Sequence, residues 1–180
     1  GLFELGHGRR LRCISEVWRS SRCFSSRMVH ETQSAEETHD VGARLASALH
    51  PGDVILLTGD LGTGKTTFIQ GVIAGLGGVG PVTSPSFTLL HEYACVRASR
   101  ERRDEGTVAM VRHLDLYRLA DPGVDLDRIG LPELLQDARA LTVIEWADRL
   151  PTAATTDLVA SMRAPAHVPA RRVWRMAFSH

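Results

Sequence analysis

The segment that most constrains the fold is Gly59–Thr66 (GDLGTGKT), which follows a short apolar run and precedes a run with helical periodicity. It matches the pattern G-x-x-x-x-G-K-[S/T]. Its glycines permit positive φ angles, so that successive backbone N–H groups can point into one concavity, and the positive end of the following helix adds to that field. Such a loop binds the phosphates of a nucleotide, so the sequence predicts a strand, this loop and a helix in that order.

Lysine usage supports the same interpretation. Lys65 is the only lysine among 21 basic residues, the other 20 being arginine. A lysine is required where a compact charge must sit on a flexible stem, and in this pattern it reaches the β- and γ-phosphates while the hydroxyl of Thr66 ligates Mg²⁺. The residues expected to contact the nucleotide are those of the loop and the start of its helix: Gly59, Asp60, Leu61, Gly62, Thr63, Gly64, Lys65, Thr66 and Thr67.

The flanking sequence predicts an α/β fold. Ser34–Glu37 has the pattern of a helix-capping box, and the helix that follows is ended by Pro51-Gly52. Val54–Thr58 is a short, continuous apolar run, which favours a buried parallel strand. Further strands are predicted at Phe87–Tyr93, Val108–Leu114, Leu141–Ile144, Leu158–Arg163 and Arg172–Phe178, with a short helix at Pro132–Leu135. Strands interleaved with helices indicate a P-loop NTPase-like, three-layer fold with a mostly parallel central sheet.

A magnesium site needs a second protein oxygen, usually from an acidic residue at the end of a neighbouring strand. Two residues satisfy that condition: Asp115 follows one predicted strand and Glu145 follows another. From the sequence pattern alone, both remain candidates. The guanine-reading motif N-K-x-D is absent, because the only lysine already lies in the phosphate loop. A GTP-dependent switch is therefore not expected.

Composition excludes other classes of protein. The chain has 180 residues, 43% of them hydrophobic, and 21 basic residues balance 21 acidic ones. This is the composition of one globular domain, which we place at residues 31–180, and it gives no net field for binding nucleic acid. The apolar runs are too short to cross a bilayer. Three widely spaced cysteines provide neither a disulfide framework nor a metal-ligand pattern.

Residues 1–30 differ from the rest of the chain. Residues 1–27 contain six arginines and five serines but only two acids. An arginine-rich, serine-rich and acid-poor segment is typical of an organelle transit peptide, and a disordered basic tail or a mis-assigned start has the same composition. We expect this segment to stay outside the fold. The protein is then cytoplasmic, or lies in a mitochondrion or plastid if the segment directs import.

Four segments together resemble one known family. They are Gly59–Thr67 (GDLGTGKTT), Thr83–Leu89 (TSPSFTL), His113–Leu119 (HLDLYRL) and Val143–Trp146 (VIEW). In this order and spacing the chain resembles the TsaE (YjeE) family of small P-loop ATPases, which are needed in bacteria to make threonylcarbamoyladenosine in tRNA. The resemblance covers roughly residues 32–178.

The resemblance implies roles for individual residues. Thr66 and Glu145 would hold Mg²⁺, and Asp115 would help at the metal or at the attacking water. Thr38, on the first helix, matches a position expected on the adenine side. The switch-like loop near the γ-phosphate would contain Ser84, Ser86 and Thr88. Lys65, Asp115 and Glu145 are thus the expected catalytic residues.

The resemblance also implies a function. The chain would bind ATP with Mg²⁺, hydrolyse it slowly and support threonylcarbamoyl transfer to adenosine 37 of tRNA, together with TsaD-like and TsaB-like partner proteins. Contact with tRNA would be indirect, which agrees with the zero net charge. Two alternatives share the phosphate loop: a small-molecule kinase, and a nucleotide-dependent interaction module without turnover.

Overall fold

The computed structural model describes residues 11–18, 28–95, 107–120, 126, 129–137, 139–151 and 172–179. The strands in this part of the chain are β1 (Leu11–Trp18), β2 (Met28–Thr32), β3 (Val54–Gly59), β4 (Leu90–Ala94), β5 (Met110–Asp115), β6 (Ala140–Glu145) and β7 (Val173–Ser179). The helices are α1 (Ala35–Leu45), α2 (Lys65–Gly75) and α5 (Leu131–Gln136), with 3₁₀ turns η1 (Ala46–Ala48) and η2 (Ala147–Arg149).

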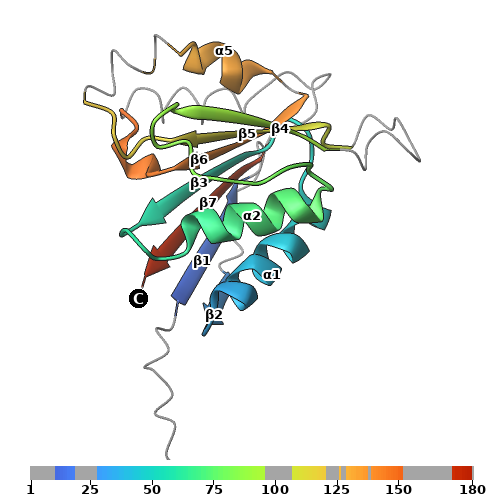
Figure 1. Ribbon diagram of the computed structural model, residues 1–180, viewed down its shortest axis with the longest axis vertical. Coiled ribbons are helices and arrows are strands. Elements are labelled where there is room, and N and C mark those ends of the chain that lie inside the picture. The colour runs from blue at the N-terminus through green and yellow to red at the C-terminus, as the bar shows by residue number, and fades with distance from the viewer. Residues whose placement is uncertain are drawn as a thin grey trace, which may run out of the picture.

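The described strands form one sheet in the order β2-β1-β7-β3-β6-β5-β4 (Figure 1). The four consecutive strands β7, β3, β6 and β5 run parallel. Antiparallel pairing is confined to the two sides, where β4 pairs with β5 and β1 pairs with both β2 and β7. The predicted mostly parallel central sheet is confirmed, and the phosphate loop leaves the sheet from its middle, after β3.

Alternate side chains of β3 enter two separate hydrophobic cores. Ile55 and Leu57 are fully buried with residues of α1 and α2, whereas Val54 and Leu56 are buried with residues of α5 and η2. This alternation follows from the period of two along a strand, and the apolar character of both sets requires cover on both faces. Figure 1 shows α1 and α2 on one side of the sheet and α5 on the other. The expected three-layer α/β architecture is confirmed.

The first helix begins as the capping pattern predicts. The Oγ of Ser34 accepts a hydrogen bond from the backbone N–H of Glu37 at 3.1 Å, and Glu37 Oε2 accepts one from the N–H of Gln33 at 2.7 Å. These bonds satisfy backbone donors that a helix start leaves unpaired. The cap fixes where α1 starts, and α1 then packs along α2.

Glycines set how closely α1 and α2 approach. A Cβ atom added at Gly71 of α2 would lie 1.9 Å from the carbonyl oxygen of His39, and one added at Gly42 of α1 would lie 2.2 Å from the carbonyl oxygen of Phe68. Both contacts are with backbone, which cannot move aside without shifting a helix. The helix that carries Lys65 and Thr66 is therefore placed by direct contact with α1.

We expect Gly71→Ala to destabilise the protein, although alanine favours helices by about 1 kcal/mol over glycine. Forcing a methyl group against the backbone of α1 costs about 1–3 kcal/mol in comparable overpacked sites. For a chain of this size that corresponds to a melting temperature lower by roughly 2–10 °C, measured by thermal unfolding. Ala74→Ser, at an exposed position of the same helix, is the control. A Gly71→Ala protein as stable as the unmodified chain would contradict this account of the helix contact.

The structure corrects the expectation that residues 1–30 stay outside the fold. Residues 11–18 form β1, which pairs with β7 over seven residues and with β2 over five, and β2 itself begins at Met28. The prediction was wrong because it was based on composition. Strand pairing depends on backbone N–H and C=O groups, and nearby arginine and serine residues do not prevent it. Without β1, β7 would present an open edge. A targeting role for the segment stays a prediction.

The strand predicted at Phe87–Tyr93 begins three residues later than expected, at Leu90. The segment Phe87–Leu89 is not part of β4, because the N–H groups of Thr88 and Leu89 both bond to the carbonyl of Pro85 and Leu89 adopts a φ of 65°. The predicted strand at 158–163 lies outside the described residues. Within the described part of the chain, no helix has the length and apolar character needed to traverse a lipid bilayer.

Candidate functional site

The loop between β3 and α2 forms the floor of a cavity of about 330 Å³ at the carboxyl end of the central strands. Gly59, Gly62 and Gly64 have φ angles of 129°, 80° and 87°, a backbone conformation that favours glycine. A Cβ at Gly59 would in addition lie 2.2 Å from the carbonyl oxygen of Phe178 in β7. The loop is thereby held against the sheet in the conformation that gathers backbone N–H groups at the start of α2. The residues that line the cavity are Leu61, Gly62, Thr63, Gly64, Lys65, Thr66, Thr67, Ser84, Ser86, Asp115, Tyr117, Glu145 and Trp146.

The side chain of Lys65 lies folded over the loop. Its Nζ donates to the carbonyl oxygens of Gly59 and Asp60 at 2.6 and 2.7 Å, and it lies 4.1 Å from the centre of the Trp146 ring. Burial lowers the pKa of Lys65 from its ordinary value, and the nearby carboxylates, Glu145 first among them, act in the opposite direction. The ammonium group is thus a partly desolvated cation whose present partners are neutral carbonyls, and an anion entering the cavity can replace them.

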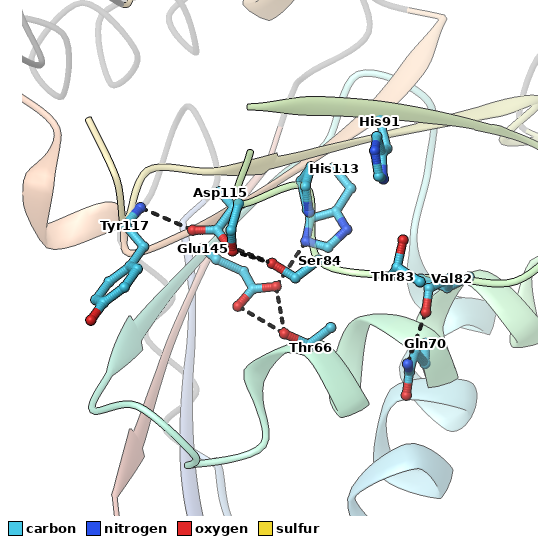
Figure 2. A network of polar contacts seen from close by, with 12 residues as sticks. Thr66, Gln70, Val82, Thr83, Ser84, His91, His113, Asp115, Tyr117 and Glu145 are labelled. Atoms are coloured by element: carbon cyan, nitrogen blue, oxygen red, sulfur yellow. Dashed lines mark hydrogen bonds and ion pairs between the residues drawn. The ribbon is translucent and has the colours of Figure 1, made fainter. Parts of the chain in front are cut away.

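Thr66 and Glu145 meet at the edge of the cavity (Figure 2). The Thr66 Oγ1 donates to the Glu145 carboxylate, at 2.9 Å from Oε1 and 3.2 Å from Oε2. Glu145 is the last residue of β6 and is 3% exposed, while Thr66 lies in the first turn of α2. The two residues are 79 positions apart in sequence. Thr66 and Glu145, the two residues expected to hold Mg²⁺, are therefore direct neighbours, and their role at the metal stays a prediction.

Asp115 ends β5, directly beside Glu145 in the register of the sheet. Its Oδ2 accepts hydrogen bonds from the hydroxyls of Ser84 and Ser86, both at 2.5 Å, and its Oδ1 accepts one from the N–H of Tyr117 at 2.9 Å. The carboxylate is 2% exposed, and protein donors occupy both oxygens. Asp115 thus ties the switch-like loop to the same corner of the sheet as Glu145 (Figure 2).

The segment before these serines is held at two further points. Gln70 of α2 donates its amide N–H to the carbonyl of Val82 at 2.9 Å. The hydroxyl of Tyr93 on β4 donates to the carbonyl of Thr83 at 3.1 Å and accepts from its N–H at 3.3 Å. The loop is therefore connected to α2, the helix that carries Lys65 and Thr66, as well as to the sheet.

Tyr117 and Trp146 also line the cavity. The sequence analysis did not assign either of these aromatic residues to the site. Trp146 has a φ of 57°, a conformation that a tryptophan rarely adopts, and its ring lies 4.8 Å from that of Tyr117. Local strain of this kind occurs at sites where the surrounding structure imposes it. The sequence contains the signal, since Tyr117 and Trp146 lie within the two motifs that carry Asp115 and Glu145, but an aromatic after a strand end is as often a packing residue.

The expected site residues do not all gather here. Leu61 to Thr67 line the cavity together with Ser84, Ser86, Asp115 and Glu145, whereas Gly59 and Asp60 contribute carbonyls to Lys65 rather than lining it. Thr88 lies outside the cavity, with its N–H bonded to Pro85. Thr38 is also outside. Its hydroxyl is buried and bonded to Thr32 and to the carbonyl of Ser34, and its role on the adenine side stays a prediction.

The donor set suits magnesium rather than a transition metal. The described residues contain no cluster of three or more histidine, cysteine or acidic side chains that could hold an ion. Instead the site offers a hydroxyl, Thr66, beside a buried carboxylate, Glu145, next to a loop that favours phosphate. Mg²⁺ prefers oxygen ligands and is commonly held by one or two carboxylates together with substrate phosphates. These residues therefore fit a magnesium–nucleotide complex.

Comparison with known proteins agrees with this geometry. Residues 32–172 match the model of a family described as threonylcarbamoyl adenosine biosynthesis protein TsaE. Proteins named "tRNA threonylcarbamoyladenosine biosynthesis protein TsaE" are similar: that of Mycobacterium tuberculosis is 41% identical over 120 residues, that of Nostoc 40% over 117, and that of Bacillus subtilis 38% over 116.

These matches cover 64% of this chain in each case, and 66%, 65% and 64% of the three relatives. The chain thus matches just under two thirds of the length of the curated relatives. A crystal structure titled as that of YdiB from Bacillus subtilis is 30% identical, with a TM-score of 0.48 over 77% of this chain and 72% of that one.

Proposed function

The chain belongs to the TsaE family of threonylcarbamoyl adenosine biosynthesis proteins, and from that premise we propose that it binds and slowly hydrolyses ATP with Mg²⁺ to support threonylcarbamoyl transfer to tRNA. The observation that carries the proposal is the meeting of Thr66 with Glu145 at the rim of a glycine-rich phosphate loop. A loop, a hydroxyl and a buried strand-end carboxylate in this arrangement are the parts that P-loop ATPases use.

The residues divide the work of binding between them. Backbone N–H groups of the loop and the start of α2 bind the phosphates. Lys65 exchanges its carbonyl partners, Gly59 and Asp60, for phosphate oxygens, which supplies charge where negative charge increases during transfer. Thr66 and Glu145 would hold the metal, which would supply charge neutralisation at the phosphate oxygens.

The remaining part of the proposal concerns Asp115 and the two serines that donate hydrogen bonds to it. Ser84 and Ser86 both donate to Asp115, so the switch-like loop and this carboxylate act as one unit beside the phosphates. We expect that unit to position the attacking water, or to add an oxygen at the metal. Slow turnover in the isolated chain follows if partner proteins are needed to set this loop in its reactive arrangement.

The partners we propose are TsaD-like and TsaB-like proteins. With 21 basic and 21 acidic residues the chain has no overall attraction for a polyanion. We therefore assign contact with tRNA to the partners and ATP hydrolysis to this chain.

The proposal is tested by measuring phosphate release from ATP with and without TsaD-like and TsaB-like proteins, alongside a screen of small phosphoryl acceptors. We expect slow, Mg²⁺-dependent release of inorganic phosphate, a change in rate when the partners are added, and no labelled acceptor. Transfer of the γ-phosphoryl group to an acceptor would instead identify a small-molecule kinase. Nucleotide binding without turnover under every condition would identify an interaction module.

A further inference from the structure

A buried histidine beside the site has no place in the chemistry described so far. His113 lies on β5, two residues before Asp115, and is 0% exposed. Its Nε2 is 2.8 Å from Oε1 of Glu145. Burying an imidazole is costly unless it is hydrogen-bonded, and an aliphatic side chain would fill a central strand without that cost. The Glu145 contact is thus what distinguishes histidine from an apolar residue here.

The hydrogen-bond geometry assigns the direction of this contact. Glu145 as a carboxylate only accepts, so Nε2 of His113 must be the donor. The other ring nitrogen, Nδ1, is buried and has no hydrogen-bond partner among the described residues. With the proton on Nε2, only the Nδ1 lone pair lacks a partner, whereas the other tautomer would leave the Nδ1 N–H without an acceptor and set the Nε2 lone pair against the carboxylate. The structure therefore favours one tautomer, aimed at Glu145.

The histidine also lies on the correct face of the sheet. Every second side chain of β5 lies on the same face of the sheet, so His113 shares a face with Val111 and Asp115. Val111 belongs to the core that α1 and α2 cover. His113 is paired with Val143 on the neighbouring strand, two residues before Glu145. Its donor and the Thr66 hydroxyl, which comes from α2, thus reach the same carboxylate from two different elements (Figure 2).

We propose that His113 is a positioning residue that fixes the orientation of the Glu145 carboxylate for binding magnesium. The inference rests on the proposed function, because it takes Glu145 to face the metal. If the Thr66 oxygen turned toward an ion, the His113 bond to Oε1 would still hold the carboxylate of Glu145 in place. Outer residues that orient a metal ligand commonly change metal affinity by about 10–100-fold.

Two substitutions separate this role from packing. In glutamine the side-chain nitrogen lies about where Nε2 of histidine lies, so His113→Gln retains a donor toward Glu145. In asparagine the nitrogen matches Nδ1 instead, so His113→Asn retains a polar side chain but loses that donor. The measurement is the affinity for Mg²⁺ at saturating ADP, by calorimetry, together with the affinity for ADP in EDTA. Neither quantity requires turnover.

We expect His113→Asn to weaken Mg²⁺ binding about 10–100-fold, His113→Gln to restore most of it, and ADP affinity in EDTA to stay unchanged in both. Wild-type Mg²⁺ affinity in His113→Asn, an equal loss in both variants, or an equal loss in EDTA would overturn the proposal. If His113→Asn does not fold, His113→Met, which has similar size and no donor, replaces it. Failure of the proposed function is distinct: ADP binding to the unmodified chain would then not respond to Mg²⁺ at all.

Discussion

Replacing Lys65 with alanine is expected to abolish measurable ATP turnover while the protein remains folded. Among the described residues, the Nζ atom contacts the loop's own oxygens and the face of Trp146, and the nearby buried carboxylates of Glu145 and Asp115 keep their own hydrogen-bond donors when it is removed. Removing one preorganised charge or donor at a reacting centre costs about 100–1,000-fold in rate, or ~3–4 kcal/mol. Phosphate release at saturating ATP and Mg²⁺ measures the loss, and thermal unfolding checks the fold.

The control is Arg44→Ala, which removes the same charge from an exposed position on α1. It should retain turnover, because the effect of Lys65 is local to the phosphates rather than a change in net charge. Unchanged turnover in a folded Lys65→Ala protein would refute the assignment of the phosphate loop.

The second large effect concerns the metal. Glu145→Gln is expected to lower turnover at least about 100-fold at limiting Mg²⁺, which corresponds to ~3 kcal/mol, while affinity for ADP in EDTA changes little. Glutamine keeps the volume and one acceptor for Thr66 and His113 but lacks the negative charge that Mg²⁺ requires. The phosphate loop binds mostly through backbone and does not depend on that charge. Turnover across a Mg²⁺ titration is the measurement.

A matched control is Asp148→Asn, three residues further on, since Asp148 is exposed and lies outside the residues that line the cavity. It removes a nearby negative charge without removing a ligand and should leave the Mg²⁺ dependence unchanged. If Glu145→Gln loses ADP affinity in EDTA as strongly as it loses turnover, Glu145 supports the fold or the nucleotide rather than the ion.

The phosphate loop and its neighbours were predictable because their signals are local. Ser34 caps its helix within four residues, Val54–Gly59 is a short apolar run, and Gly59–Thr66 encodes its own conformation through glycine. The central parallel strands follow from the same local patterns. Asp115 and Glu145 could be identified as strand-end acids before their neighbours were known.

Long-range contacts were not predictable in this way. Thr66 contacts Glu145 across 79 positions of sequence, and His113 donates to Glu145 across 32. The local sequence pattern indicates neither contact. The motif His113–Leu119 indicated Asp115 as a catalytic residue. His113, two positions earlier, is indistinguishable in sequence from an ordinary core residue, because its contact with Glu145 is not visible there. Only the register of β5 against β6 shows what it contacts.

The edges of the sheet were the hardest to predict. Pairing of β1 with β7 joins the first twenty residues to the last ten, and composition over the first thirty residues pointed to a segment outside the fold. Thr38, which the resemblance places on the adenine side, bonds through its hydroxyl to Thr32 and to the Ser34 carbonyl, and the local sequence pattern does not indicate the contact with Thr32. For β1, backbone pairing outweighed what the composition of the segment indicated.

The central claim is that this chain holds a magnesium–nucleotide complex between Thr66 and Glu145. It is tested most directly by a crystal structure with a non-hydrolysable ATP analogue and Mn²⁺, whose anomalous scattering locates the ion without assumptions. The account predicts an anomalous peak at the cavity rim, at coordination distance from Thr66 Oγ1 and from the analogue's phosphate oxygens, with Glu145 bound to it directly or through one water. A peak away from Thr66 and Glu145, or phosphates outside the Gly59–Thr66 loop, would contradict it.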